Sequence, residues 1–150
     1  MAPADSSRDR WAAFPFLQAE VELTETAVET GRNGRGHLVL RNVGKEVIDL
    51  QTDSLVRAVV LYPSFESAAR FTDAVLATGR IVHLTTGEEA TISVIFSTTT
   101  EENGKRAALA PGEYLVKVDL PIFERRSEGH GMERSHLEMP LVGLRLVEQT

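Results

Sequence analysis

The chain has 150 residues, of which 42% are apolar and 25% are charged, with a formal net charge of −6 and no cysteine. This length and composition are those of one folded domain with a core of its own. The acidic balance argues against nucleic acid as the main partner, because binding to phosphates requires an excess of lysine and arginine. Without cysteine, neither disulfide bonds nor thiolate metal ligands can form.

Residues 1–16 are largely polar and are predicted to form a loosely ordered arm before a single domain over residues 17–150. The start of the sequence lacks the apolar run of a signal peptide, and no stretch is long and apolar enough to span a membrane. Together with the missing cysteines, these features favour a cytoplasmic protein that has no membrane partner.

From residue 19 onward most of the sequence alternates between apolar and polar residues, which is the period of β-strands. The clearest inward-facing sets are, in chain order, Ala90, Ile92, Val94 and Phe96, and then Tyr114, Val116, Val118 and Leu120. A last strand is predicted over residues 137–147. It contains Pro140, which cannot donate to a neighbouring strand and so indicates an edge or a bulge.

The segment from Ser64 to Gly79 departs from this alternation. Its apolar residues recur at the spacing of a helix, Ser64 is a suitable N-terminal cap, and Gly79 suits a helix C-terminus. The sequence therefore predicts one short connecting helix over about 64–78.

Seven to eight short antiparallel strands with one connecting helix predict an all-β, immunoglobulin-like sandwich. A parallel α/β fold would need a helix between most strands, and only one is predicted. A small closed barrel remains the alternative within the all-β class.

Three turn motifs carry a resemblance to a known family. The segment 109–114, Leu-Ala-Pro-Gly-Glu-Tyr, resembles the tyrosine corner of immunoglobulin-like sandwiches, in which the tyrosine hydroxyl bonds to backbone a few residues upstream. The segment 41–50, with Asn-Val-Gly before Val-Ile-Asp-Leu, looks like a hairpin of bacterial immunoglobulin-like modules, and 84–88, Leu-Thr-Thr-Gly-Glu, looks like their turn before a long strand.

The order of these motifs, over residues 35–121, is similar to that of the bacterial intracellular proteinase-inhibitor family. The resemblance implies a non-enzymatic β-sandwich of a bacterial protein and, as its activity, protease inhibition. Function in such scaffolds belongs to the loops.

Two long segments between predicted strands are candidate binding loops. Residues 98–111 contain Lys105 and Arg106, and residues 121–136 contain further candidates of the types enriched at protein interfaces. The complete predicted partner-binding set is Phe123, Arg125, Arg126, Arg134, Lys105 and Arg106.

One cluster suggests a metal. His130, Met132, His136 and Met139 place imidazole and thioether groups within ten residues. Thioethers favour Cu(I), and imidazole suits copper or zinc. The other interpretation is an exposed glycine-rich loop in which Met139 packs in the core.

The first functional hypothesis is a non-catalytic module that binds a protein partner, without a cofactor. No Gly-x-Ser-x-Gly nucleophile motif is present, so no enzyme is expected. One alternative is a small-molecule-binding or enzymatic β-barrel, which should enclose a cavity of about 300 Å³ or more with convergent polar groups. The other alternative is copper or zinc binding by the His/Met cluster.

Overall fold

A computed structural model describes residues 16–72, 78–124, 133–139 and 141–149. For residues 123–124 and 133–138 it describes the backbone alone. This part of the chain is all-β. Its strands are β1 (Leu17–Leu23), β2 (Ala27–Glu29), β3 (Gly34–Asn42), β4 (Ile48–Asp53), β5 (Leu55–Arg57), β6 (Val59–Leu61), β7 (Ser67–Arg70), β8 (Gly79–Leu84), β9 (Glu89–Phe96), β10 (Thr99–Glu102), β11 (Lys105–Ala108), β12 (Gly112–Lys117), β13 (Asp119–Glu124), β14 (Glu133–Glu138) and β15 (Val142–Val147).

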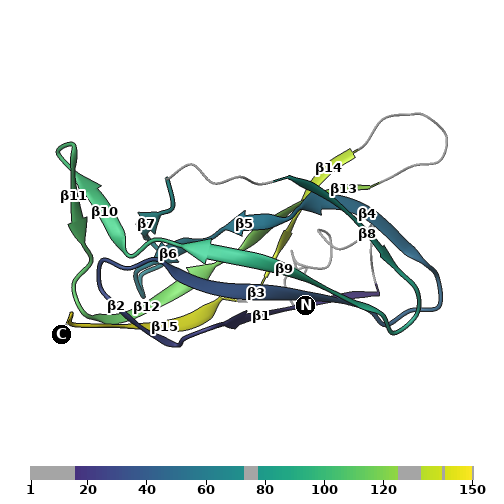
Figure 1. Cartoon of the computed structure of the whole chain (residues 1–150), viewed down its shortest axis with the longest axis horizontal. Coiled ribbons are helices and arrows are strands. Elements are labelled where there is room, and N and C mark those ends of the chain that lie inside the picture. Colours follow the sequence, from purple (N-terminus) through teal and green to yellow (C-terminus); the bar gives the residue numbers. More distant parts are fainter. Residues whose placement is uncertain (1–15, 73–77, 125–132, 140, 150) are drawn as a thin grey trace, which may run out of the picture.

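The strands form three sheets and a separate ribbon (Figure 1). The first sheet has the order β1-β3-β9-β5, the second β2-β15-β12-β6-β7 and the third β14-β13-β4-β8, while β10 and β11 pair only with each other. Most pairs are antiparallel as predicted, but β5 runs parallel to β9, and β2 runs parallel to β15.

Several strands follow one another with a single residue between them and belong to different sheets. Ser54 separates β4 from β5, Ala58 separates β5 from β6, and Val118 separates β12 from β13. The chain therefore passes from sheet to sheet almost without a loop. This explains why seven or eight predicted strands correspond to a larger number of short ones.

The inward faces of all three sheets form one hydrophobic core. Leu38 and Ile92 come from the first sheet, Val60 and Val116 from the second, and Leu50 from the third, each with at most 1% of its surface exposed. Burial of each such side chain stabilises the fold by about 1.5–3 kcal/mol. The two inward sets predicted from alternation are buried throughout, so the all-β sandwich is confirmed.

The tyrosine corner is also confirmed. The Tyr114 hydroxyl donates a hydrogen bond of 2.6 Å to the carbonyl oxygen of Ala110. Burial raises the pKa of Tyr114, and the neighbouring Tyr62 raises it further. The bond ties the start of β12 to the segment that enters it.

Asn42 explains why the other two turn motifs occur together. Its side chain is fully buried, donates to the carbonyl oxygens of Glu46 (2.7 Å) and Leu84 (3.0 Å), and accepts from the Gly44 amide (2.9 Å). The Asn42 carbonyl also accepts the Gly87 amide at 2.7 Å. The turn after β3 and the turn before β9 are therefore held together by one residue.

The predicted helix over 64–78 is wrong where the structure describes it. Ser67–Arg70 form strand β7, which pairs with β6, and residues 73–77 lie outside the described residues. Of the residues at helical spacing, Phe65 is 66% exposed, whereas Phe71, which does not share that spacing, is buried. Pro63 and Ser64 lie in a hairpin turn instead of starting a helix.

The two predicted binding loops are largely strands. Residues 98–111 contain the β10–β11 hairpin, and residues 121–136 contain most of β13 and β14, which pair with each other. The predicted last strand is divided between β14 and β15. Pro140 and residues 1–15 of the predicted arm lie outside the described residues. The described part of the chain contains no helix long and apolar enough to cross a membrane.

Candidate functional site

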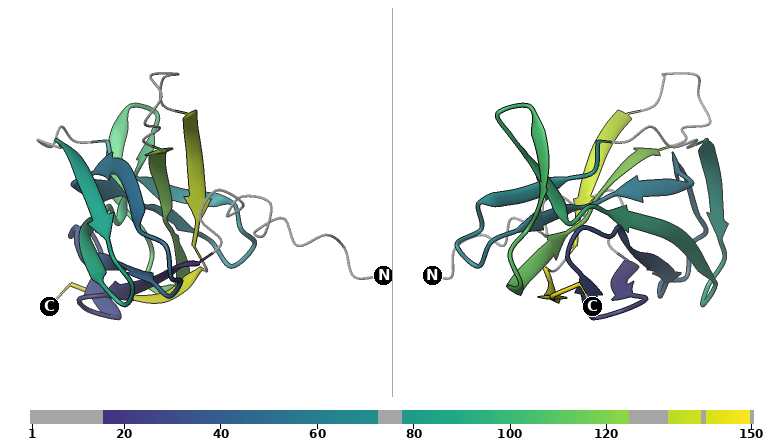
Figure 2. Two further views of the ribbon diagram at one scale, coloured as in Figure 1. Left: turned by 90° about the vertical axis from the view of Figure 1, so that its right-hand side faces the viewer. Right: turned by 60° about the vertical axis from the view of Figure 1, so that its left-hand side comes forward.

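The β10–β11 hairpin projects from one end of the sandwich (Figures 1 and 2). Its strands pair over four residues each, and its turn is Asn103-Gly104, both with positive φ (52° and 78°). Positive φ at both central residues is the geometry of the tight two-residue turn that Asn-Gly favours. The Asn103-Gly104 sequence therefore matches the tight turn that the structure shows at the tip of this hairpin.

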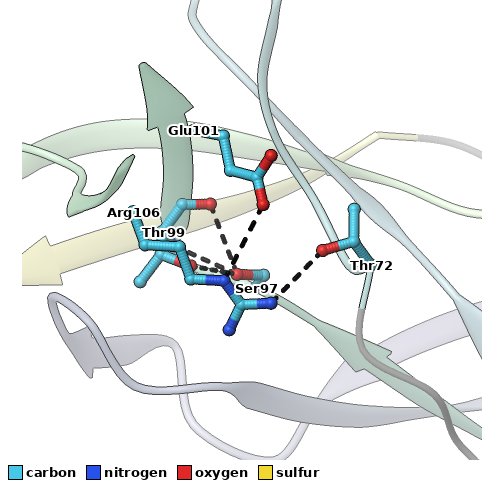
Figure 3. Close-up of polar contacts among 5 residues, drawn as sticks. All are labelled: Thr72, Ser97, Thr99, Glu101 and Arg106. Carbon is cyan, nitrogen blue, oxygen red and sulfur yellow. Dashed lines mark hydrogen bonds and ion pairs between the residues drawn. The ribbon is translucent and has the colours of Figure 1, made fainter. Parts of the chain in front are cut away.

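The base of the hairpin is anchored in the body of the domain. Leu109 is buried, and its amide donates to the Thr98 carbonyl at 2.9 Å. The fully buried Thr98 donates its hydroxyl to the Arg32 carbonyl at 2.6 Å. The Ser97 hydroxyl accepts the Thr99 amide at 3.1 Å and lies 2.9 Å from the Thr99 hydroxyl (Figure 3). These bonds fix the direction in which the hairpin leaves the core.

A groove of about 210 Å³ lies between the hairpin and β7. Ser67–Arg70 and Thr72 line one side, and residues 99–101 with Arg106 line the other. Ala68 and Ala69 are buried, so the groove has a small, apolar floor and hydroxyl-rich walls.

Arg106 spans this groove. Its Nη2 lies 3.5 Å from the Thr72 hydroxyl, and its Nε lies 3.9 Å from Glu101 Oε1 (Figure 3). Both charged side chains are more than half exposed. An exposed pair of this kind contributes about 0–1 kcal/mol to stability. The contact therefore adds little to the stability of the fold and leaves Arg106 accessible at the groove.

The predicted partner-binding residues fall into two places. Lys105 and Arg106 lie on β11, whereas Phe123 and Arg134 are opposite each other in the backbone register of β13 and β14. Strands β13 and β14 lie toward the other end of the molecule from the β10–β11 hairpin (Figure 1). The structure therefore does not unite these residues in one site. Arg125 and Arg126 lie outside the described residues.

The predicted metal ligands are also only partly described. His130 and Met132 lie outside the described residues, and His136 is described by its backbone alone, opposite Pro121. Met139 is buried in the hydrophobic core, where packing accounts for its side chain. The described residues contain no group of three His, Asp or Glu that could hold an ion.

A second hollow, of about 560 Å³, bears on the barrel alternative. It is lined by residues 24–25, 27–29 and 32–35 together with Val147. These residues belong to β2 and the turns around it, to the start of β3 and to the end of β15, and among them Val28 is part of the hydrophobic core. Its rim carries Glu29 and Arg32, whose charged groups are 3.4 Å apart. The inward faces themselves are filled with aliphatic side chains.

Phe65 is not among the binding residues predicted from the sequence, because the segment that contains it is predicted to be a helix. Phe65 has φ of 72° and is the most exposed of the large apolar residues in the described chain. The signal that would have found this turn is Pro63-Ser64, since proline followed by serine favours the central positions of a turn.

No known protein family and no curated protein matches the sequence. Among solved structures, the chain is similar to the β-glucosidase EmGH1 from Erythrobacter marinus (TM-score 0.47, 14% identity), covering 87% of this chain and 15% of the enzyme. It is similar to the CARDB domain of the PF1109 protein from Pyrococcus furiosus (0.44, 11%), covering 89% and 94% of the two chains. The chain is also similar to the putative ApaA protein from Bordetella pertussis, with a TM-score of 0.45 and 8% identity. That match covers 89% of this chain and 95% of the other.

Proposed function

We propose that this chain is a non-catalytic protein-interaction module that binds its partner with the β10–β11 hairpin and the groove beside β7. The observation that carries this proposal is that the hairpin projects from the sandwich, is anchored at its base and places no side chain of β10 or β11 in the hydrophobic core. Leu109 already bonds to Thr98 at its base, so a turn of two to five residues would serve the fold equally well.

The exposed side chains of the hairpin support the proposal. All four residues of β11 are exposed, and the Arg106 guanidinium lies 3.5 Å from the Thr72 hydroxyl and 3.9 Å from Glu101 at the groove. Arginine is enriched where protein interfaces form, and a pre-organised element loses little conformational entropy on binding. A partner that reaches Arg106 also reaches the hydroxyl groups of the groove.

The test begins with capture of partners from the native host and their identification by mass spectrometry. Replacement of residues 99–108 by a four-residue Gly-Ser turn should retain the melting temperature of the sandwich and abolish capture. Arg106→Ala should weaken capture, while Arg145→Ala serves as the matched control, because Arg145 forms a similarly exposed ion pair with Glu113 on β12. Undiminished capture by the shortened variant would refute the hairpin as the binding element.

The resemblance to intracellular proteinase inhibitors suggests one class of partner, a serine protease that prefers lysine or arginine. Lys105 is exposed next to the turn of the hairpin, which suits insertion into a basic-specific pocket. Trypsin activity should then fall in the presence of the domain, and Lys105→Ala should relieve the inhibition. Full trypsin activity at a tenfold excess of the domain would remove this class and leave other protein partners.

A further inference from the structure

The β6–β7 turn holds an aromatic residue in a backbone conformation that glycine normally occupies. The Phe65 amide donates to the Tyr62 carbonyl at 2.8 Å, and the Tyr62 amide donates to the Glu66 carbonyl at 2.9 Å. These two bonds define a hairpin loop of three residues that ends in the left-handed region, where Phe65 has φ of 72°. Glycine is favoured there because a Cβ atom is strained in that region, and for a bulky residue this is an outlier.

Burial of the ring does not compensate for this strain. Phe65 is 66% exposed, and Tyr62, at the other end of the turn, is 40% exposed. Pro63 between them is exposed as well. We call these three residues the aromatic tip. Its exposed rings add little to the free energy of unfolding, and the positive φ of Phe65 lowers that free energy.

The aromatic tip contacts the body of the domain through the ring of Tyr62. The Tyr62 ring packs against the Tyr114 ring, with centroids 5.8 Å apart and an angle of 39° between the planes. Tyr114 is fixed in turn by its hydrogen bond to Ala110. The tip thus presents apolar surface in a fixed arrangement, so that little conformational entropy is lost when a partner covers it.

We infer that the aromatic tip is a docking element that places the Phe65 ring in an apolar pocket of a protein partner, with a cationic group of the partner facing Glu66. This inference rests on the proposed function of the chain as an interaction module. Strained residues that the fold does not require are concentrated at binding sites. Aromatic side chains that enter a pocket dominate the energy of many interfaces.

The charges around the tip indicate the chemistry of the partner. Glu66 is exposed and has no ion pair among the described residues, and the whole chain carries a net charge of −6. Residues 62–69 contain no lysine or arginine. A lipid surface, which is commonly anionic, would be recognised by basic residues, so a protein pocket with a cationic rim is the better complement.

The first arm of the test measures strain. Phe65→Gly and Phe65→Asn both tolerate positive φ and should raise the urea midpoint above that of the wild type, whereas Phe65→Ala should not. Ile81→Ala is the matched control, because Ile81 is 58% exposed on β8 and lies in a regular strand. An unchanged or lowered midpoint for Phe65→Gly would show that the turn is not strained and would overturn the inference.

The second arm identifies and measures the partner. A photoreactive phenylalanine analogue at position 65 should crosslink one protein in cells of the native host, and the same analogue at position 81 should not. With that protein purified, Phe65→Gly should weaken binding roughly tenfold or more, while Phe65→Trp and Ile81→Ala retain it. Equal affinity of Phe65→Gly and the wild type, crosslinking only to a second copy of this chain, or binding to anionic vesicles that requires Phe65 would each refute the inference.

The two proposals fail separately. If replacement of residues 99–108 abolishes binding and Phe65→Gly does not, the hairpin is the binding element and the aromatic tip is not. If Phe65→Gly abolishes binding and the shortened hairpin does not, the aromatic tip is the binding element and the hairpin is not. If neither change affects binding of the crosslinked protein, both are wrong.

Discussion

Replacing Tyr114 by phenylalanine removes one hydrogen bond and leaves the packing of the ring in place. The hydroxyl of Tyr114 is 2.6 Å from the Ala110 carbonyl, and the residue is 6% exposed. Ala110 itself is exposed, so water can reach its carbonyl once the hydroxyl is gone. The loss should therefore be the ordinary net value of a hydrogen bond, about 0.5–1.5 kcal/mol, without a further penalty for a buried unpaired group.

Urea denaturation at pH 7, followed by circular dichroism, measures this loss as a lower midpoint at an unchanged slope. In a thermal melt each kcal/mol corresponds to about 2–4 °C for a chain of this size. Tyr62→Phe is the matched control, because the Tyr62 hydroxyl makes no hydrogen bond within the described chain and only its ring contacts Tyr114. A midpoint for Tyr114→Phe equal to the wild-type value would refute the tyrosine corner as a source of stability.

The same pair of proteins gives a second measurement at alkaline pH. The pKa of Tyr114 in the folded protein is raised above its ordinary value of 10.0, chiefly by burial. The folded state therefore resists deprotonation, and the contribution of the neutral hydroxyl is complete below pH 10 and lost as the pH rises through the folded pKa. The stability difference between wild type and Tyr114→Phe should shrink above pH 10. A difference that stays constant or grows would contradict this sign.

Three further changes test other parts of the structure. Gly34→Ala would place a Cβ atom 2.0 Å from the ring of the fully buried Phe96, which should cost about 1–3 kcal/mol and cost less in a Phe96→Leu background. The pKa of Glu88 is lowered from 4.5, chiefly by a hydrogen bond from the Thr85 side chain, so this stabilisation is present above pH 4.5 and lost as the pH falls through the folded pKa. Glu88→Gln should therefore lower the urea midpoint at pH 7 and approach the wild type well below pH 4.5, and a difference that persists in acid would contradict this. Gly104→Ala adds a Cβ in open space at φ of 78°, so it should speed amide exchange in residues 99–108 by the equivalent of about 1–2 kcal/mol while the global midpoint stays unchanged.

The parts of the fold that the sequence predicted correctly have local causes. Alternation in residues 90–96 and 114–120 reports directly on which face is buried, because side chains on a strand point to opposite sides in turn. The turn motif at Asn42 works through bonds to Gly44 and Glu46, which are near it in sequence. Such features are visible without knowledge of the distant strands.

The parts that it missed depend on distant partners. β7 has four residues and is a strand only because β6 pairs with it, and the adjacent buried Ala68 and Ala69 fit a helix face equally well. The alternation through Val118 is unbroken, so nothing in it marks the change of sheet. Residues 98–111 are predicted as a loop that carries Lys105 and Arg106, whereas the structure has a hairpin there. Asn103-Gly104 between two short polar segments is the hairpin signal that this prediction did not use.

The parallel pairing of β2 with β15 has a consequence for the speed of folding. Val28 is opposite Leu146, the Thr30 amide donates to the Val147 carbonyl at 2.9 Å, and the Gln149 side chain donates to the Thr30 carbonyl at 2.6 Å. Pairing residues 27–29 with residues 145–147 closes a loop that contains most of the chain, and this costs conformational entropy before any stabilising contact forms. Sandwiches dominated by such long-range pairings fold in milliseconds to seconds. On the ribosome, β2 has no strand partner until residues 145–147 have emerged, so most of the chain must wait for one late strand before its second sheet is complete.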